Sequence, residues 1–96
     1  MSTPPTARWV RSTGVLWRWL PDGVLLLTPH TQEPLAVRGS AAAVWAHLVQ
    51  PQSTDQLVAH LLAELPPPGI DRSTVVADVE GLLRSLAACG AVEATD

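Results

Sequence analysis

Hydrophobic and polar side chains alternate over residues 15–20, with the two-residue period that is typical of a half-exposed β-strand. Val15, Trp17 and Trp19 fall on one face of this segment, and Arg18 falls on the other. Because the two tryptophans share the apolar face, we expect them in the core or at its rim. The pattern predicts one strand of a small sheet.

Two further strands are predicted after a turn at residues 21–23, whose sequence Pro-Asp-Gly is a turn signal. Residues 24–28 form a short apolar run that fits a buried strand, and residues 35–38 alternate again. Residues 9–11 can start another strand near the N-terminus. These strands are expected to form a small antiparallel sheet.

The spacing of apolar residues changes to three or four beyond residue 40, which is typical of one face of a helix. Ser40 is a favourable N-cap residue, so a first helix of about ten residues is expected to follow it. Ser53 and Gln56 have the spacing of a capping box, which predicts the start of a second amphipathic helix. Residues 66–69, Pro-Pro-Pro-Gly, end that helix because proline cannot continue it.

A third helix is predicted to begin at Asp71 or Ser73 and to close at Gly90, where glycine suits the left-handed conformation. Its apolar stripe consists of Val75, Val76, Val79, Leu82, Leu83 and Leu86. Residues 91–93 can add one short extended segment. Three short strands followed by three helices predict a single α+β domain, in which an antiparallel sheet packs against a three-helix unit.

The composition is that of a folded chain, since 47% of the 96 residues are hydrophobic. No apolar run reaches the roughly 20 residues that span a bilayer, and residues 1–6 do not resemble a signal peptide. Cys89 is the only cysteine, so an intrachain disulfide is excluded. We therefore expect a cytoplasmic protein that does not associate with a membrane.

The net charge of −3 is divided unevenly along the chain. Residues 1–48 carry four arginines against two acidic residues, whereas residues 49–96 carry two arginines against seven acidic residues. A mildly acidic chain without a cluster of basic residues is a poor partner for a phosphate backbone. Nucleic acid is therefore not an expected ligand.

The titratable residues do not form a recognisable catalytic or metal-binding pattern. His30, His47 and His60 are not at ligand spacing from one another, so we expect ordinary surface or boundary histidines. Cys89 lacks a neighbouring basic residue that would activate its thiol. The sequence thus predicts neither an enzyme nor a cofactor nor a metal ion.

Four segments of the chain resemble the PqqD-like family. They are Gly-Val-Leu-Leu-Leu-Thr-Pro at 23–29, Leu-Ala-Val-Arg-Gly-Ser-Ala-Ala-Ala-Val-Trp at 35–45, Thr-Asp-Gln-Leu-Val-Ala-His-Leu at 54–61, and Val-Ala-Asp-Val-Glu-Gly-Leu-Leu-Arg-Ser-Leu at 76–86, followed by Gly90. The order of the elements and the loop lengths also agree. The resemblance implies a peptide-binding domain over residues 13–93, between a flexible N-terminal segment 1–12 and a tail 94–96.

Members of this family are recognition elements for ribosomally synthesised and post-translationally modified peptides (RiPPs), and they have a winged helix-turn-helix fold. The resemblance implies that this chain binds the leader segment of a precursor peptide without catalysing a reaction, and that it presents the leader to a partner enzyme. In size the chain is most similar to the free-standing recognition protein of split lasso-peptide systems. That protein works with a separate leader protease.

In the family, the leader adds as a strand to the third strand of the sheet, and its side chains enter a groove beside the third helix. Carried over to this sequence, the strand runs from Pro34 to Arg38 and the helix covers residues 73–89. The candidate peptide-binding residues are Pro34, Leu35, Ala36, Val37, Arg38, Val75, Asp78, Val79, Leu82 and Ser85. Plain core packing is an equal alternative for Val75 and Leu82. Relatives often have Leu-Asn near the strand end, and this chain departs from that pattern.

Three other functions stay open. A DNA-binding winged helix shares the fold, although the predicted third helix has no net positive charge, since it carries Arg72, Asp78, Glu80 and Arg84. A peptide chaperone in quinone cofactor biosynthesis would use the same surface as a RiPP recognition element. A purely structural subunit of a larger complex is the third alternative.

Overall fold

The computed structural model describes residues 8–29, 33–64 and 71–95 of the chain. The elements in chain order are β1 (Arg8–Arg11), β2 (Leu16–Leu20), β3 (Gly23–Leu27), β4 (Leu35–Arg38), α1 (Ser40–His47), β5 (Gln52–Ser53), α2 (Thr54–Glu64), α3 (Arg72–Ala88) and β6 (Val92–Thr95). The predicted α+β class, with a three-stranded antiparallel sheet followed by three helices, is confirmed. The prolines predicted to end the second helix lie outside the described residues.

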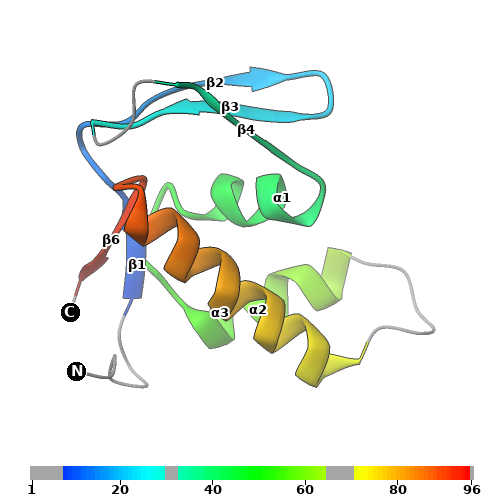
Figure 1. The fold of residues 1–96 in the computed structure, drawn as a ribbon. Helices are drawn as coiled ribbons and strands as arrows, with labels where there is room; N and C mark the ends of the chain where they lie inside the picture. The colour runs from blue at the N-terminus through cyan, green and yellow to red at the C-terminus, as the bar shows by residue number, and fades with distance from the viewer. Residues whose placement is uncertain (1–7, 30–32, 65–70, 96) are drawn as a thin grey trace.

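The main sheet has the strand order β2-β3-β4, and both pairings are antiparallel. In Figure 1 it forms the upper layer of the molecule, and α1 lies directly beneath it. The register places six apolar side chains on the face toward the helices, namely Trp17, Trp19, Val24, Leu26, Leu35 and Val37. No described element covers the opposite face of this sheet (Figure 1).

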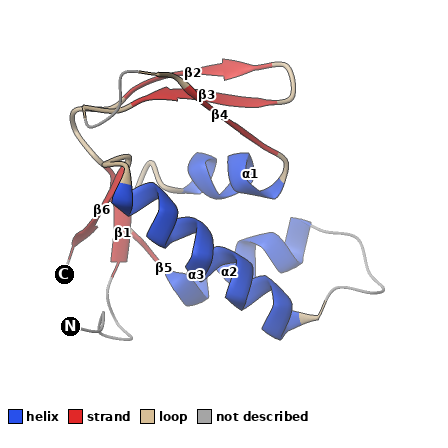
Figure 2. Cartoon of the chain, in the orientation of Figure 1, coloured by secondary structure: helices blue, strands red, loops and turns tan. Residues whose placement is uncertain are grey.

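A second sheet joins the two ends of the described chain (Figure 2). Its strand order is β5-β1-β6, and β1 is antiparallel to both neighbours. The strand predicted at residues 9–11 is confirmed as β1, and β6 overlaps the extended segment predicted at residues 91–93. Because β1 is paired on both sides, ordered structure extends to the N-terminal side of the boundary expected at residue 13.

Side-chain caps begin α2 and α3, as the sequence predicts. The Gln56 N–H donates to Ser53 Oγ at 3.1 Å, and the Ser53 N–H donates to Gln56 Oε1 at 2.8 Å, which confirms the capping box. Asp71 is the N-cap of α3, and its carboxylate accepts hydrogen bonds from the N–H and the hydroxyl of Ser73. Gly90 has a φ of 83°, the left-handed conformation predicted beyond the end of α3.

Helix α1 begins differently from the prediction. The N-cap position belongs to Gly39, which has a φ of 64°, and Ser40 is the first helical residue. The carbonyl oxygen of Gly39 accepts hydrogen bonds from the N–H groups of Ala42 and Ala43. Because glycine adopts this conformation without strain, the chain passes from β4 into α1 through one residue, and no side chain caps the helix. The predicted N-cap role of Ser40 is therefore wrong.

The core lies between the main sheet and the helices. Its buried residues include Val24, Leu26, Trp45, Leu48, Leu57, Val58, Val79, Leu83 and Leu86. Trp17 and Trp19 lie on the predicted face, yet they are 40% and 51% exposed, so neither is a core residue. Since β2 is an edge strand, the rings of Trp17 and Trp19 extend past the core. Trp17 still contacts the rim of the core, because its ring packs edge to face on buried Trp45. Among the helices described, none is long and apolar enough to cross a membrane.

Candidate functional site

Strand β4 forms one edge of the main sheet, and it pairs with β3 alone among the described strands. The cross-strand pairs are Gly23–Arg38, Val24–Val37, Leu25–Ala36 and Leu26–Leu35. An edge strand presents a row of backbone N–H and C=O groups that a further strand can bind. The geometry of β4 therefore suits recognition of an extended peptide.

The register shows which backbone groups of β4 face the open edge. A two-residue turn joins β2 to β3, so Leu20 and Gly23 on either side of it form a hydrogen-bonded pair. Successive residues of a strand direct their backbone groups to opposite sides, so Gly23 faces β2 and Val24 faces β4. In β4, the backbone groups of Ala36 and Arg38 consequently point away from β3 and toward the open edge.

The side chains along β4 are mostly exposed. Ala36 and Arg38 lie on the outer face of the sheet, whereas Val37 points inward and is buried in the core. Leu35 shares the face of Val37 but remains 44% exposed at the rim of the core. Pro34 precedes the strand and is exposed, and its missing N–H is tolerated at an edge because no neighbouring strand needs that donor.

Arg38 has a partner that sequence reasoning missed. Its Nε lies 2.8 Å from Oδ2 of Asp22, in the turn between β2 and β3. The turn and the end of β4 meet because Arg38 lies opposite Gly23 in the sheet. Both side chains are largely exposed, so this ion pair is worth at most about 1 kcal/mol. Arg38 is thus an oriented charge at the end of β4.

The candidate residues on α3 divide into two groups. Val75 and Val79 are only 6% and 1% exposed and pack in the same core cluster as Val37. Core packing is therefore the structural role of both valines, and it leaves them almost no surface for a ligand. Leu82 is half-buried against that cluster, whereas Asp78 and Ser85 are exposed. The accessible candidates on α3 are thus Asp78, Leu82 and Ser85.

The opposite edge of the main sheet carries an aromatic cluster that sequence reasoning also missed. The guanidinium of Arg11 lies 4.6 Å from the ring centre of Trp17 and 4.7 Å from that of Trp45. Its Nε and one terminal nitrogen donate to the carbonyl oxygen of Trp45 at 3.1 and 2.8 Å. Burial lowers the pKa of Arg11, although an arginine stays charged at neutral pH. No local signal links these residues, because they come from β1, β2 and α1.

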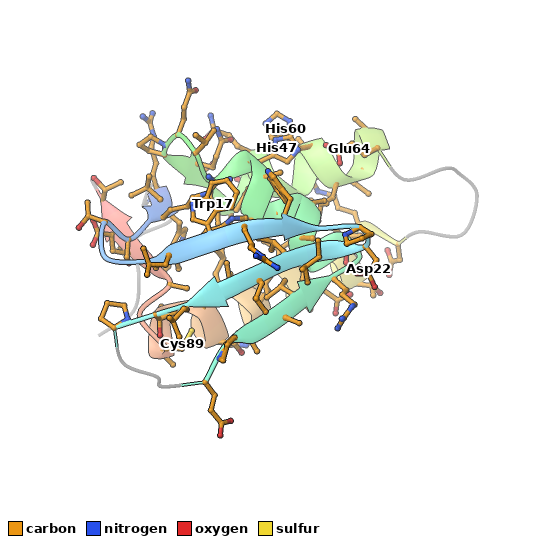
Figure 3. The ribbon with its side chains drawn as sticks, turned by 90° about the horizontal axis from the view of Figure 1, so that it is seen from above. Trp17, Asp22, His47, His60, Glu64 and Cys89 are labelled. Atoms are coloured by element: carbon orange, nitrogen blue, oxygen red, sulfur yellow. The ribbon has the colours of Figure 1, made fainter. Side chains whose placement is uncertain are left out.

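Two histidines that are not at ligand spacing in the sequence are in contact in the structure: His47 lies at the C-terminal end of α1, and His60 lies on α2. The rings of His47 and His60 are stacked, with centroids 4.1 Å apart and planes 8° apart (Figure 3). His47 Nε2 shares a hydrogen bond of 2.5 Å with Glu64. Within the described segments, no group of three or more His, Cys, Asp or Glu residues is placed to hold a metal ion. His30 lies outside the described residues.

Cys89 is the one thiol of the chain. It is half-buried beside the end of α3, and its Sγ donates to the carbonyl oxygen of Leu86 at 3.3 Å. Seen from above, Cys89 lies on the β4 side of the sheet, whereas Trp17, His47 and His60 lie on the β2 side (Figure 3).

A three-stranded antiparallel sheet followed by three helices, with β4 at one edge of the sheet, defines an α+β domain. A family model, "Coenzyme PQQ synthesis protein D (PqqD)", matches residues 23–92, and the chain belongs to this family. The matched segment runs from β3 into β6 and leaves out β1 and β2.

Two solved structures are similar in fold. One is described as TbiB1 in complex with the TbiA(beta) leader peptide; it is 26% identical, has a TM-score of 0.76, and the alignment covers 88% of this chain and 94% of that one. The other is the PqqD truncation of Methylobacterium extorquens PqqCD, described as a stand-alone RiPP recognition element; it is 19% identical, with a TM-score of 0.70 and coverage of 96% and 95%. No curated protein matches the sequence.

Proposed function

We propose that this chain is a RiPP recognition element, which binds the leader segment of a precursor peptide and presents it to a separate processing enzyme. The observation that carries the proposal is the open edge of β4 in a member of the PqqD family. The complex of TbiB1 with a leader peptide supports it, because that protein shares the fold and 26% of its sequence with this chain.

The proposed complex is formed by strand addition. The leader pairs with the outward N–H and C=O groups of Ala36 and Arg38, and each hydrogen bond contributes about 0.5–1.5 kcal/mol. Ala36 is small and exposed, so its side chain leaves room for the neighbouring strand. The main-chain bonds give affinity that does not depend on the leader's sequence.

Selectivity arises in this proposal from the side chains beside β4. Alternate leader residues face inward, where Leu35 and the half-buried Leu82 offer an apolar surface. Asp78 and Ser85 are the proposed polar contacts on α3, and Val75 and Val79 belong to the buried core. The preferred leader therefore carries an apolar or aromatic side chain at an inward position.

The protein is proposed to act without catalysis, in the cytoplasm, with a leader protease of a lasso-peptide system as its partner. These finer assignments carry over from the family resemblance. A DNA-binding role is not favoured, because the charges of α3, Arg72 and Arg84 against Asp78 and Glu80, sum to zero.

The experiment that tests the proposal is a calorimetric titration with the leader segment of the cognate precursor peptide. We expect saturable binding of the isolated leader and none of the core segment that follows it. Incubation of protein and precursor without other enzymes should leave the precursor's mass unchanged. Absence of leader binding would contradict the recognition role, and a cleaved or modified precursor would contradict its non-catalytic nature.

A further inference from the structure

Strand β2 is the second open edge of the main sheet. It pairs with β3 alone among the described strands, and β3 separates it from β4. Since Leu20 and Gly23 form the hydrogen-bonded pair at the turn, the backbone groups of Trp17 and Trp19 point to this open edge. The sheet therefore offers strand-pairing groups at both of its edges.

The inward side chains of β2 form an exposed aromatic surface that is held in place from below. The rings of Trp17 and Trp19 meet edge to face, with centroids 5.3 Å apart. Trp17 rests in turn on buried Trp45 and on the guanidinium of Arg11. Half-exposed, pre-positioned tryptophans of this kind are the residue type that dominates binding energy at protein interfaces.

The outer face of β2 carries one positive charge. The strand contains Arg18 and no acidic residue. Arg18 is exposed on the outer face of β2, and no ion pair is formed by it within the described part of the chain. The next acidic residue, Asp22, is already paired with Arg38. The β2 edge therefore complements a segment that carries acidic side chains.

A second copy of this chain is a poor occupant of the edge. Antiparallel pairing of two β2 strands about their centre would place Arg18 opposite Arg18, and like charges in directly opposite positions destabilise a sheet. A nucleic acid is also disfavoured, because Arg11 is already engaged by Trp45 and Arg18 alone on β2 does not neutralise a row of phosphates.

We propose that β2 is a second strand-addition site, which binds an extended acidic segment of the partner processing enzyme. In the added strand, residues opposite Trp17 and Trp19 are apolar, and the residue opposite Arg18 is Asp or Glu. Leader and enzyme then occupy opposite edges of one sheet and do not compete. This proposal rests on the proposed function for the identity of the partner.

The test uses a blocked peptide of alternating glutamate and valine, titrated into the full chain and followed by the amide resonances. We expect shifts at residues 16–20 and at the indole N–H groups of Trp17 and Trp19, whether or not leader is bound. A peptide of alternating lysine and valine is the matched control and should bind at least about fivefold more weakly. Arg18→Glu should reverse the preference between the two peptides.

Several results would overturn the proposal: shifts at β4 instead of β2, displacement of the peptide by leader, equal binding of the two peptides, or tighter binding of duplex DNA at residues 16–20. Trp19→Ala, at a half-exposed site, should weaken binding of the glutamate peptide and leave the affinity for the leader unchanged. Ala36→Pro should weaken binding of the leader and leave the affinity for the glutamate peptide unchanged. If leader fails to bind while the glutamate peptide still binds β2, the proposed function fails and the second site stands.

Discussion

Replacing Ala36 with proline tests the leader-binding edge without breaking the sheet. The N–H of Ala36 points away from β3, so its loss removes no hydrogen bond between β3 and β4. Proline is accepted at such edge positions, and the preceding Leu35 already has the extended backbone that proline requires of its neighbour. We therefore expect the variant to fold with nearly the parent's stability.

Leader binding should fall because one donor of the proposed ladder is gone and the ring crowds the incoming strand. The loss of one to two hydrogen bonds amounts to about 1–3 kcal/mol, or a rise in Kd of about 5- to 150-fold. Calorimetric titration measures the affinity, and circular dichroism confirms the fold. Ala36→Ser is the matched control, since serine keeps the N–H and should bind like the parent. A folded Ala36→Pro protein with unchanged affinity would refute the proposed pairing.

Three further changes have defined outcomes. Leu82→Ala should weaken leader binding about tenfold and lower the free energy of unfolding by about 1–2 kcal/mol, because Leu82 is half-buried; equal affinity would exclude Leu82 from the site. Gly23→Ala should destabilise the protein by about 1–3 kcal/mol in urea unfolding, since its Cβ would collide with the Val37 carbonyl oxygen, whereas Gly81→Ala meets only the distant end of Arg84. The pKa of Asp71 is lowered by hydrogen bonds from Ser73, so its stabilising effect is present above its ordinary pKa and is lost as pH falls through the lowered value. The protection factors of the amides at the start of α3, in which exchange rates are corrected for their intrinsic pH dependence, should therefore fall in acid, and Asp71→Asn should remove most of that change.

The elements were predictable where their signals are local. The capping box of Ser53 and Gln56, the Asp71 cap and the left-handed Gly90 each depend on a few neighbouring residues, and all three form as expected. Ser40 is not the N-cap, because Gly39 adopts a positive φ and connects β4 directly to α1. The position of the N-cap depends on where β4 ends, and the residues around the start of the helix do not determine that end.

Contacts between distant segments were not predictable. Alternation assigned Trp17 and Trp19 to the correct face, but it could not show that β2 is an edge and leaves them exposed. The stacking of His47 on His60 depends on how α1 packs against α2. The Arg38–Asp22 pair likewise depends on the register between β3 and β4. Sequence spacing carries no information about such packing.

Amide hydrogen exchange, with and without saturating leader, tests the central claim most directly. The amides of Ala36 and Arg38 face the open edge of β4, so they should exchange quickly in the free protein and at least about tenfold more slowly in the complex. The amides of Leu35 and Val37 point toward β3 and should exchange slowly in both states. The amides of Trp17 and Trp19 point to the open edge of β2, and their exchange rates should not change when leader binds. Saturating leader that leaves Ala36 and Arg38 unprotected, or that protects Trp17 and Trp19 instead, would contradict leader binding at β4.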